Sequence, residues 1–183
     1  VEKRDVDVLI GTQMVAKGHH FPGITLVGII SGDTSLNMPD FRSAERTFQL
    51  VSQASGRAGR ETHGARVIIQ TVNPEHFCFQ KAAEHDYEGF FEEEFKARED
   101  AGYPPCLRLA GIRMEGIKEE SVERASSRAA AIIQRLATHV RGIIVLGPAP
   151  ALIPRLKGLY RFHMLIKSKD ASALNRFLAA FKK

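Results

Sequence analysis

The segment Gln53-Ala-Ser-Gly-Arg-Ala-Gly-Arg60 combines the residue types that proteins use to bind phosphate. Arg57 and Arg60 are three residues apart, so two guanidinium groups can reach one anionic site. Gly56 and Gly59 lack a Cβ atom, which lets a ligand approach the backbone closely. Glycine and arginine are also common in solvated loops, which is the alternative interpretation. The arrangement favours a phosphate ligand, because this spacing is much rarer than a single glycine-rich turn.

A second group of chemically suitable residues lies near the C-terminus, within seven positions: Arg155, Lys157, Tyr160 and Arg161. Cationic side chains can follow the phosphates of a nucleic acid, and an aromatic ring can stack on an unpaired base. The neighbouring Pro154 and Gly158 indicate a turn. We therefore predict a contact with single-stranded or forked DNA, with a solvated turn as an equally simple alternative.

The charge of the chain is unevenly distributed. Residues 1–75 carry 8 Lys and Arg against 8 Asp and Glu, and residues 76–105 carry 3 against 8. Residues 106–183 carry 15 against 5, a net charge of +10. A positive field of this kind favours a polyanion or an acidic peptide as the partner of the C-terminal part.

The elements that must position the first site are expected to form an α/β layer. Short apolar runs at residues 7–10, 24–30 and 65–71 are typical of buried parallel strands. Between the last two runs, residues 43–55 place apolar side chains at helical spacing: Ala44, Phe48, Val51 and Ala54. Strand, strand, helix and strand in this order predict a doubly wound α/β domain over residues 1–75.

The rest of the chain is expected to form a connector and a second domain. Residues 76–105 are acidic, with phenylalanines at helical spacing, and predict a helical connector that ends at Gly102 and Pro104-Pro105. Residues 106–183 predict strands at 107–114, 143–146 and 160–167 and helices at 119–139 and 171–181. Their order suggests a small two-layer α+β domain. The first of these helices carries an apolar set: Ala125, Ala129, Ile132, Ile133 and Leu136.

Neither metal nor membrane binding is expected. His19 and His20 are adjacent on an expected turn, where two neighbouring side chains rarely bind one ion. Cys78 and Cys106 are too few for a disulfide framework or a cysteine-rich zinc site. No apolar run approaches the ~20 residues of a membrane-spanning helix, and the charged opening Val1–Asp7 does not fit a secretion signal. These observations predict a cytoplasmic protein.

The Gln53–Arg60 segment resembles motif VI of superfamily 2 helicases. In these motors the arginines of the second RecA-like lobe reach ATP that is bound mainly by the first lobe. The resemblance implies that Arg60 is an arginine finger that stabilises charge on the transferring phosphoryl group. It also implies that Arg57 grips phosphate and that Gln53 and Gly56 line the same cleft.

The segment Gly11-Thr-Gln-Met-Val-Ala-Lys-Gly-His-His-Phe-Pro22 resembles motif V of the same superfamily. Motif V couples the nucleotide cleft to the DNA backbone. The resemblance implies that Thr12, Gln13 and Lys17 contact DNA and that Gly18 and His19 line the nucleotide cleft. Residues 1–75 are then expected to be the C-terminal part of a second RecA-like lobe.

Several uncommon strings resemble the primosomal replication-restart helicases in particular. They are Lys17-Gly-His-His-Phe-Pro22, Asp40-Phe-Arg-Ser-Ala-Glu-Arg46, Tyr103-Pro-Pro105, Val145-Leu-Gly-Pro-Ala-Pro-Ala151 and Leu156-Lys-Gly-Leu-Tyr-Arg161. The resemblance runs from about residue 7 to the end of the chain. Two departures are Ala54-Ser55, where a Val-Ala pair is expected, and Leu159, where arginine often stands. The second departure removes a possible contact with DNA or a partner.

The resemblance implies an ATP-dependent 3′-to-5′ DNA helicase that restarts replication at abandoned forks in the bacterial nucleoid. ATP and Mg²⁺ are its expected cofactors, and zinc is expected only in a part of the parent protein absent here. No phosphate-binding Gly-x-x-x-x-Gly-Lys-[Ser/Thr] string occurs in the sequence, so this chain alone is expected to be a fragment without catalytic activity. A non-catalytic binding module and another superfamily 2 motor are the alternatives.

The expected partners are branched and single-stranded DNA, other primosome proteins and the acidic tail of single-stranded DNA-binding protein. Arg155, Arg161 and Arg176 are candidates for that tail. A partial RecA-like lobe would leave apolar strand edges exposed. We therefore also expect the chain to self-associate through its N-terminal part.

Overall fold

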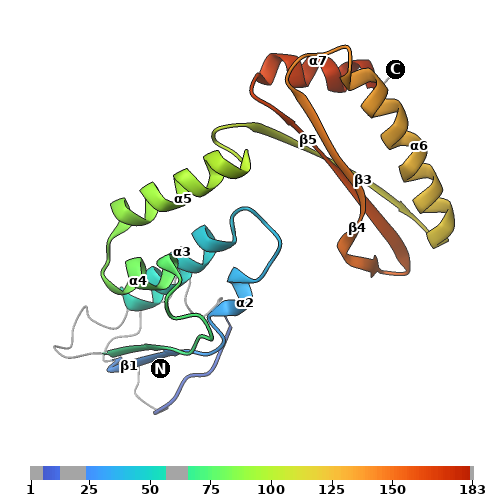
Figure 1. Ribbon diagram of the computed structural model, residues 1–183. Helices are drawn as coiled ribbons and strands as arrows, with labels where there is room; N and C mark the ends of the chain where they lie inside the picture. The colour runs from blue at the N-terminus through green and yellow to red at the C-terminus, as the bar shows by residue number, and fades with distance from the viewer. Residues whose placement is uncertain (1–5, 13–23, 57–65, 182–183) are drawn as a thin grey trace. The chain divides into compact units, whose positions relative to one another are not determined.

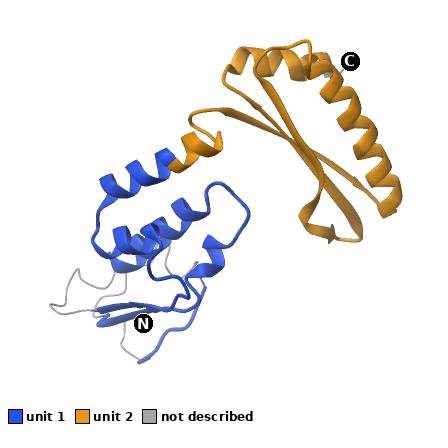
Figure 2. Ribbon diagram, in the orientation of Figure 1, with its two compact units in different colours: residues 1–96 blue, residues 97–183 orange. Residues whose placement is uncertain are grey.

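The computed structural model describes residues 6–12, 24–56 and 66–181, and these form two compact units, residues 1–96 and 97–183 (Figure 2). The first unit contains β1 (Leu26–Ile29), α2 (Asp33–Leu36), α3 (Ser43–Ser55), β2 (Arg66–Ile69) and α4 (Phe77–Ala83). Helix α5 (Tyr87–Ala101) begins in the first unit and ends in the second. The second unit adds β3 (Arg108–Gly116), α6 (Glu119–Ala137), β4 (Ile143–Leu156), β5 (Leu159–Ser168) and α7 (Ala171–Phe181) (Figure 1).

The first unit is built around a two-stranded parallel sheet. Strand β1 pairs with β2 from Leu26 opposite Arg66 to Ile29 opposite Ile69, and α3 lies between the two strands in the chain. Parallel neighbours need such a crossover, so the expected strand, helix, strand order is confirmed. Helix α3 buries Phe48, Val51 and Ala54, as its spacing predicts. Phe48 stacks on Phe90 of α5, with 4.1 Å between the ring centroids.

The predicted strand at residues 7–10 is wrong. The structure gives this segment no strand, and Val8, Leu9 and Ile10 are exposed. A strand needs a hydrogen-bonded neighbour, and among the described residues β1 pairs with β2 alone. The apolar composition of the run is compatible with a strand, but no strand pairs with it among residues 6–12, 24–56 and 66–181.

The second unit has the expected two layers, a three-stranded antiparallel sheet in the order β3-β5-β4 and two helices that cover one face (Figure 1). Its core contains Ile133 of α6, Met164 and Ile166 of β5, and Leu174 and Phe177 of α7. Phe162, Met164 and Ile166 alternate along β5 and are all buried on its inner face. Lys167 lies on the other face, where its Nζ donates to the Ala101 carbonyl at 3.0 Å and lies 3.7 Å from the centroid of the Tyr103 ring.

Two details of the second unit differ from the sequence prediction. Strand β4 continues to Leu156, ten residues beyond the expected end, because β5 pairs with it along a long hairpin. Helix α6 buries Val122, Ser126, Ala130 and Ile133, whereas Ile132, which the sequence placed in the apolar set, is 49% exposed.

The whole chain is therefore a mixed α/β protein with a small parallel sheet and a separate antiparallel sheet. In the described part of the chain, no helix is both long and apolar enough to cross a bilayer. The finer division at residues 75 and 105 stays a prediction.

Candidate nucleic-acid interface

The arginine-rich segment is described only at its start. Gln53 lies on the exposed side of the last turn of α3, and Gly56 follows the helix, with its N–H donating to the Ser52 carbonyl at 2.9 Å. Arg57 and Arg60 lie outside the described residues, as do Gln13, Lys17, Gly18 and His19. Thr12 is described and exposed. Because most of its residues lie outside the described part of the chain, the nucleotide site stays a prediction.

The carboxylate of Asp33 ties together the segments that follow β1 and β2. It accepts hydrogen bonds from the Thr71 hydroxyl at 2.7 Å and the Val72 N–H at 2.9 Å, and the residue is 8% exposed. The hydrogen bond from the Thr71 hydroxyl and, to a smaller extent, that from the Val72 N–H stabilise the ionised carboxylate and so lower the pKa of Asp33. Sequence reasoning missed Asp33, although an aspartate directly after an apolar run and a glycine is a recognisable signal.

The candidate DNA contacts near the C-terminus lie at the end of the β4–β5 hairpin. Leu156 pairs with Leu159, so the turn has two residues, Lys157 and Gly158. Both have positive φ, 51° and 83°. This is the backbone of a tight hairpin turn whose twist matches that of the strands. The short turn therefore holds Lys157 at a defined, exposed position at the tip.

Arg155 and Tyr160 form a cross-strand pair just behind the tip. They are directly opposite each other in the register, and the Arg155 guanidinium lies 5.1 Å from the centroid of the Tyr160 ring. A guanidinium at this distance is attracted by the face of the ring. Arg155 is exposed, so the pair presents a positive charge and an aromatic surface together.

Arg161 is placed differently from the other three candidates. Its side chain is 16% exposed, and its Nε lies 3.1 Å from Oε1 of Glu115 on the neighbouring strand β3. The same carboxylate oxygen lies 3.1 Å from Nε of Arg113. The Nε atom of Arg161 is buried and makes no hydrogen bond of good geometry, so its contact with Glu115 is an ion pair. The structure therefore groups Arg155, Lys157 and Tyr160 at the tip and holds Arg161 against the sheet.

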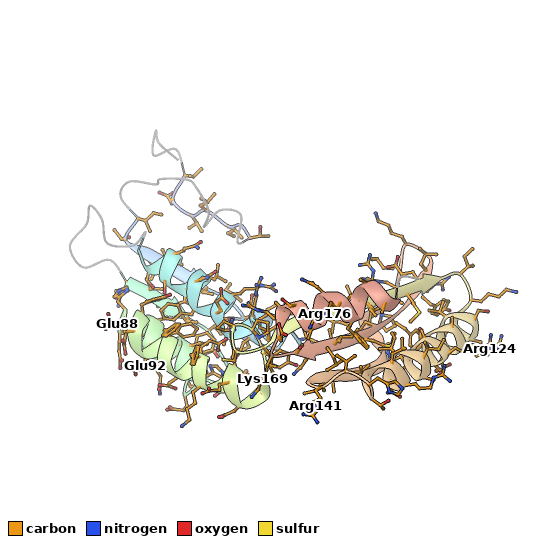
Figure 3. All side chains as sticks on the ribbon, turned by 90° about the horizontal axis from the view of Figure 1, so that it is seen from above. Glu88, Glu92, Arg124, Arg141, Lys169 and Arg176 are labelled. Atoms are coloured by element: carbon orange, nitrogen blue, oxygen red, sulfur yellow. The ribbon has the colours of Figure 1, made fainter. Side chains whose placement is uncertain are left out.

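The hairpin is not the whole basic surface of the second unit. Figure 3 shows the side chains of Arg124, Arg141, Lys169 and Arg176 at the surface, away from the hairpin residues in the sequence. In the described part of the chain, none of these four forms an ion pair within 4.0 Å. Any experiment on the hairpin must therefore separate its contribution from that of the general positive charge.

Residues 99–183 match the family model of the primosomal protein N C-terminal domain. The match covers nearly all of the second compact unit and includes the hairpin. The chain is also 44% identical over 173 residues to the replication restart protein PriA of Bacillus subtilis (strain 168), which covers 94% of this chain and 21% of that protein. The chain belongs to the PriA family. The resemblance to primosomal replication-restart proteins that the sequence indicates is thereby confirmed, and the helicase activity stays a prediction.

Other PriA proteins give the same result. The match to replication restart protein PriA of Synechocystis sp. (strain ATCC 27184 / PCC 6803 / Kazusa) is 42% identical over 91% of this chain and 20% of that protein. The match to replication restart protein PriA of Treponema pallidum (strain Nichols) is 39% identical over 96% of this chain and 26% of that protein. The chain thus spans about a fifth to a quarter of the length of these PriA relatives.

Proposed function

We propose that this chain acts as part of an ATP-dependent 3′-to-5′ DNA helicase that recognises stalled or abandoned replication forks and restarts replication by primosome assembly. The similarity to proteins named replication restart protein PriA supports the role in restart. Within the chain, we assign a DNA contact to the β4–β5 hairpin. The observation that carries this assignment is the cluster of the exposed Arg155 and Lys157 with the partly buried Tyr160 at a two-residue turn.

The first unit would contribute to the motor. The parallel β1–β2 pair with α3 between the strands is compatible with part of a RecA-like lobe. Arg57 and Arg60 would complete an ATP and Mg²⁺ site held mainly by another lobe, beside Gln53, Gly56, Gly18 and His19. Thr12, Gln13 and Lys17 would contact the DNA backbone. A purely binding role for this chain, without any part in catalysis, is the second candidate, and the exposed Arg124, Arg141 and Arg176 of the second unit favour it (Figure 3).

The salt dependence of DNA binding tests the hairpin assignment. Each cation that neutralises a phosphate releases counterions, so Arg155→Ala and Lys157→Ala should each reduce the slope of log K against log [salt] by about one. The measurement is fluorescence anisotropy of the chain with single-stranded and forked DNA across a salt series.

Arg124→Ala is the matched control, because it removes the same charge from the same unit but from α6. It should leave the slope unchanged. Equal losses from Arg124→Ala and Arg155→Ala would show that binding is spread over the basic surface and would remove the hairpin assignment. No binding at low salt would point instead to an acidic protein partner, such as the tail of single-stranded DNA-binding protein, for which Arg155, Arg161 and Arg176 are the candidates.

We also propose that the first unit self-associates or binds further strands. The first unit exposes several large apolar side chains, Leu26 of β1 and Ile68 of β2 among them, with Val8, Ile10 and Ile30 outside the strands. Exposed apolar side chains on a small sheet are a potential site of interaction or aggregation. The chain should therefore elute from gel filtration as a dimer or larger species, and Ile30→Ser with Ile68→Ser should shift it toward the monomer. A wild-type monomer at about 100 μM would contradict this proposal, since weak association at such concentrations is common for exposed strand edges.

A further inference from the structure

The strand pairing of the β4–β5 hairpin contains a register shift that cannot be predicted from its sequence. Pro150 is opposite Phe162 and Arg155 is opposite Tyr160, so β4 advances five positions while β5 advances two. The residues between these pairs on β4 are Ala151, Leu152, Ile153 and Pro154, and on β5 only Arg161. We call residues 151–154 the apolar bulge. Bulges interrupt the ladder and redirect side chains, and they are frequent beside functional sites.

The apolar bulge points large side chains into solvent. Leu152 is 55% exposed and Ile153 is 51% exposed, and Leu156, next to the turn, is 44% exposed. None of the three belongs to the core of the second unit, which is built from α6, α7 and the opposite end of the sheet. A half-exposed branched aliphatic side chain forfeits part of the free energy of burial, so three together on one short arm suggest a surface that is covered in the working complex.

The surroundings of these side chains indicate what would cover them. Arg155 and Lys157 are interleaved with the apolar residues, and the Tyr160 ring lies under the Arg155 guanidinium. An apolar protein groove would have to desolvate these cations, whereas a nucleic acid offers phosphates for the cations and flat apolar base faces for the aliphatic groups. Anionic lipid headgroups would also attract the cations, but the similarity of this unit to replication restart proteins favours nucleobases as the surface that covers the hairpin.

We propose that Leu152 and Ile153 form a wedge that inserts between stacked bases at a junction of double-stranded and single-stranded DNA. This inference rests on the proposed function, because it requires that the hairpin contacts DNA. Arg155 and Lys157 grip the flanking phosphates, and the apolar bulge replaces base stacking that the junction has already weakened. Unstacking costs least where one neighbouring base is unpaired. The wedge thus gives the hairpin a preference for forks over continuous duplex.

The test uses this chain with a forked DNA that carries 2-aminopurine at the first base pair of the duplex. Fluorescence of 2-aminopurine rises when the base loses its stacking partner, and anisotropy of a distant dye reports binding in the same sample. Wild-type chain should raise the 2-aminopurine signal about twofold or more at saturation. The double variant Leu152→Ala with Ile153→Ala should bind within about twofold of wild type, because phosphate contacts dominate affinity, but should give no rise.

Ile132→Ala is the matched control, because Ile132 is an equally exposed isoleucine on α6. It should keep both binding and the fluorescence rise. Wild-type binding without a rise, or a rise that survives in the double variant, overturns the wedge and leaves the hairpin's phosphate contacts intact. If the wild-type chain does not bind the forked DNA at low salt, the proposed DNA contact is overturned as well, and the exposed apolar residues are assigned to a protein partner.

Discussion

Replacing Ile133 with alanine should lower the free energy of unfolding of the second unit by about 2–5 kcal/mol. Ile133 is fully buried between α6 and the sheet, where it belongs to the same core as Met164, Ile166 and Phe177. Alanine removes three methyl or methylene groups and leaves a cavity that a two-layer unit can close only in part. Hydrogen exchange of the β5 amides, measured by mass spectrometry, reports this loss locally without interference from the first unit.

The neighbouring residue provides the control. Ile132 is identical in type and adjacent in the helix but 49% exposed, so Ile132→Ala should change β5 exchange very little. Helix propensity favours alanine over isoleucine equally at both positions, and the comparison therefore isolates burial. Equal protection of β5 in the two variants would show that α6 does not hold the sheet in the way that the structure indicates.

The sequence predicts the helices of this chain well because each carries its own period. Helices α3 and α7 have the predicted bounds, and the inner face of β5 follows from simple alternation. The apolar set of α6 was only half correct, because Ile132 and Ile133 are adjacent and a helix can bury only one of them fully here. The small Ser126, which is fully buried against the sheet, carries no signal in a hydrophobic pattern.

The failures concern pairing between strands, which a local pattern does not contain. Residues 7–10 have the composition of a strand but no strand beside them in the described part of the chain. Strand β4 contains Pro148, Pro150 and Pro154 and looks like a loop, yet it forms an edge strand, where the missing N–H groups of proline cost little. The apolar bulge is defined by the register of β4 with β5, so a local sequence pattern could not predict it. The turn that contains Lys157 and Gly158 could be inferred from the sequence, but the pairing of Arg155 with Tyr160 and the ion pair of Arg161 could not.

Replacing Arg60 with alanine should reduce the ATP turnover of the proposed longer helicase by about 10³-fold or more, if Arg60 is the arginine finger that motif VI implies. A guanidinium aimed at the transferring phosphoryl group stabilises charge that develops mainly in the transition state. A loss of 10³-fold corresponds to about 4 kcal/mol, which is the size of effect expected when such a group is removed. The loss should appear in kcat, with the KM for ATP changed much less. The experiment requires a protein that also contains the phosphate-binding lobe.

Two variants separate this role from a general effect of charge. Arg60→Lys keeps the positive charge but loses the planar fork, so it should recover little of the turnover. Arg66→Ala removes the same charge at the start of β2, where the side chain is exposed, and should leave kcat close to wild type. Full activity of Arg60→Ala would transfer the role to Arg57 or to another lobe. Full recovery of turnover in Arg60→Lys would show that Arg60 acts only as a positive charge near phosphate. DNA binding through the hairpin should be unaffected by either substitution of Arg60, because Arg155 and Lys157 belong to the other unit.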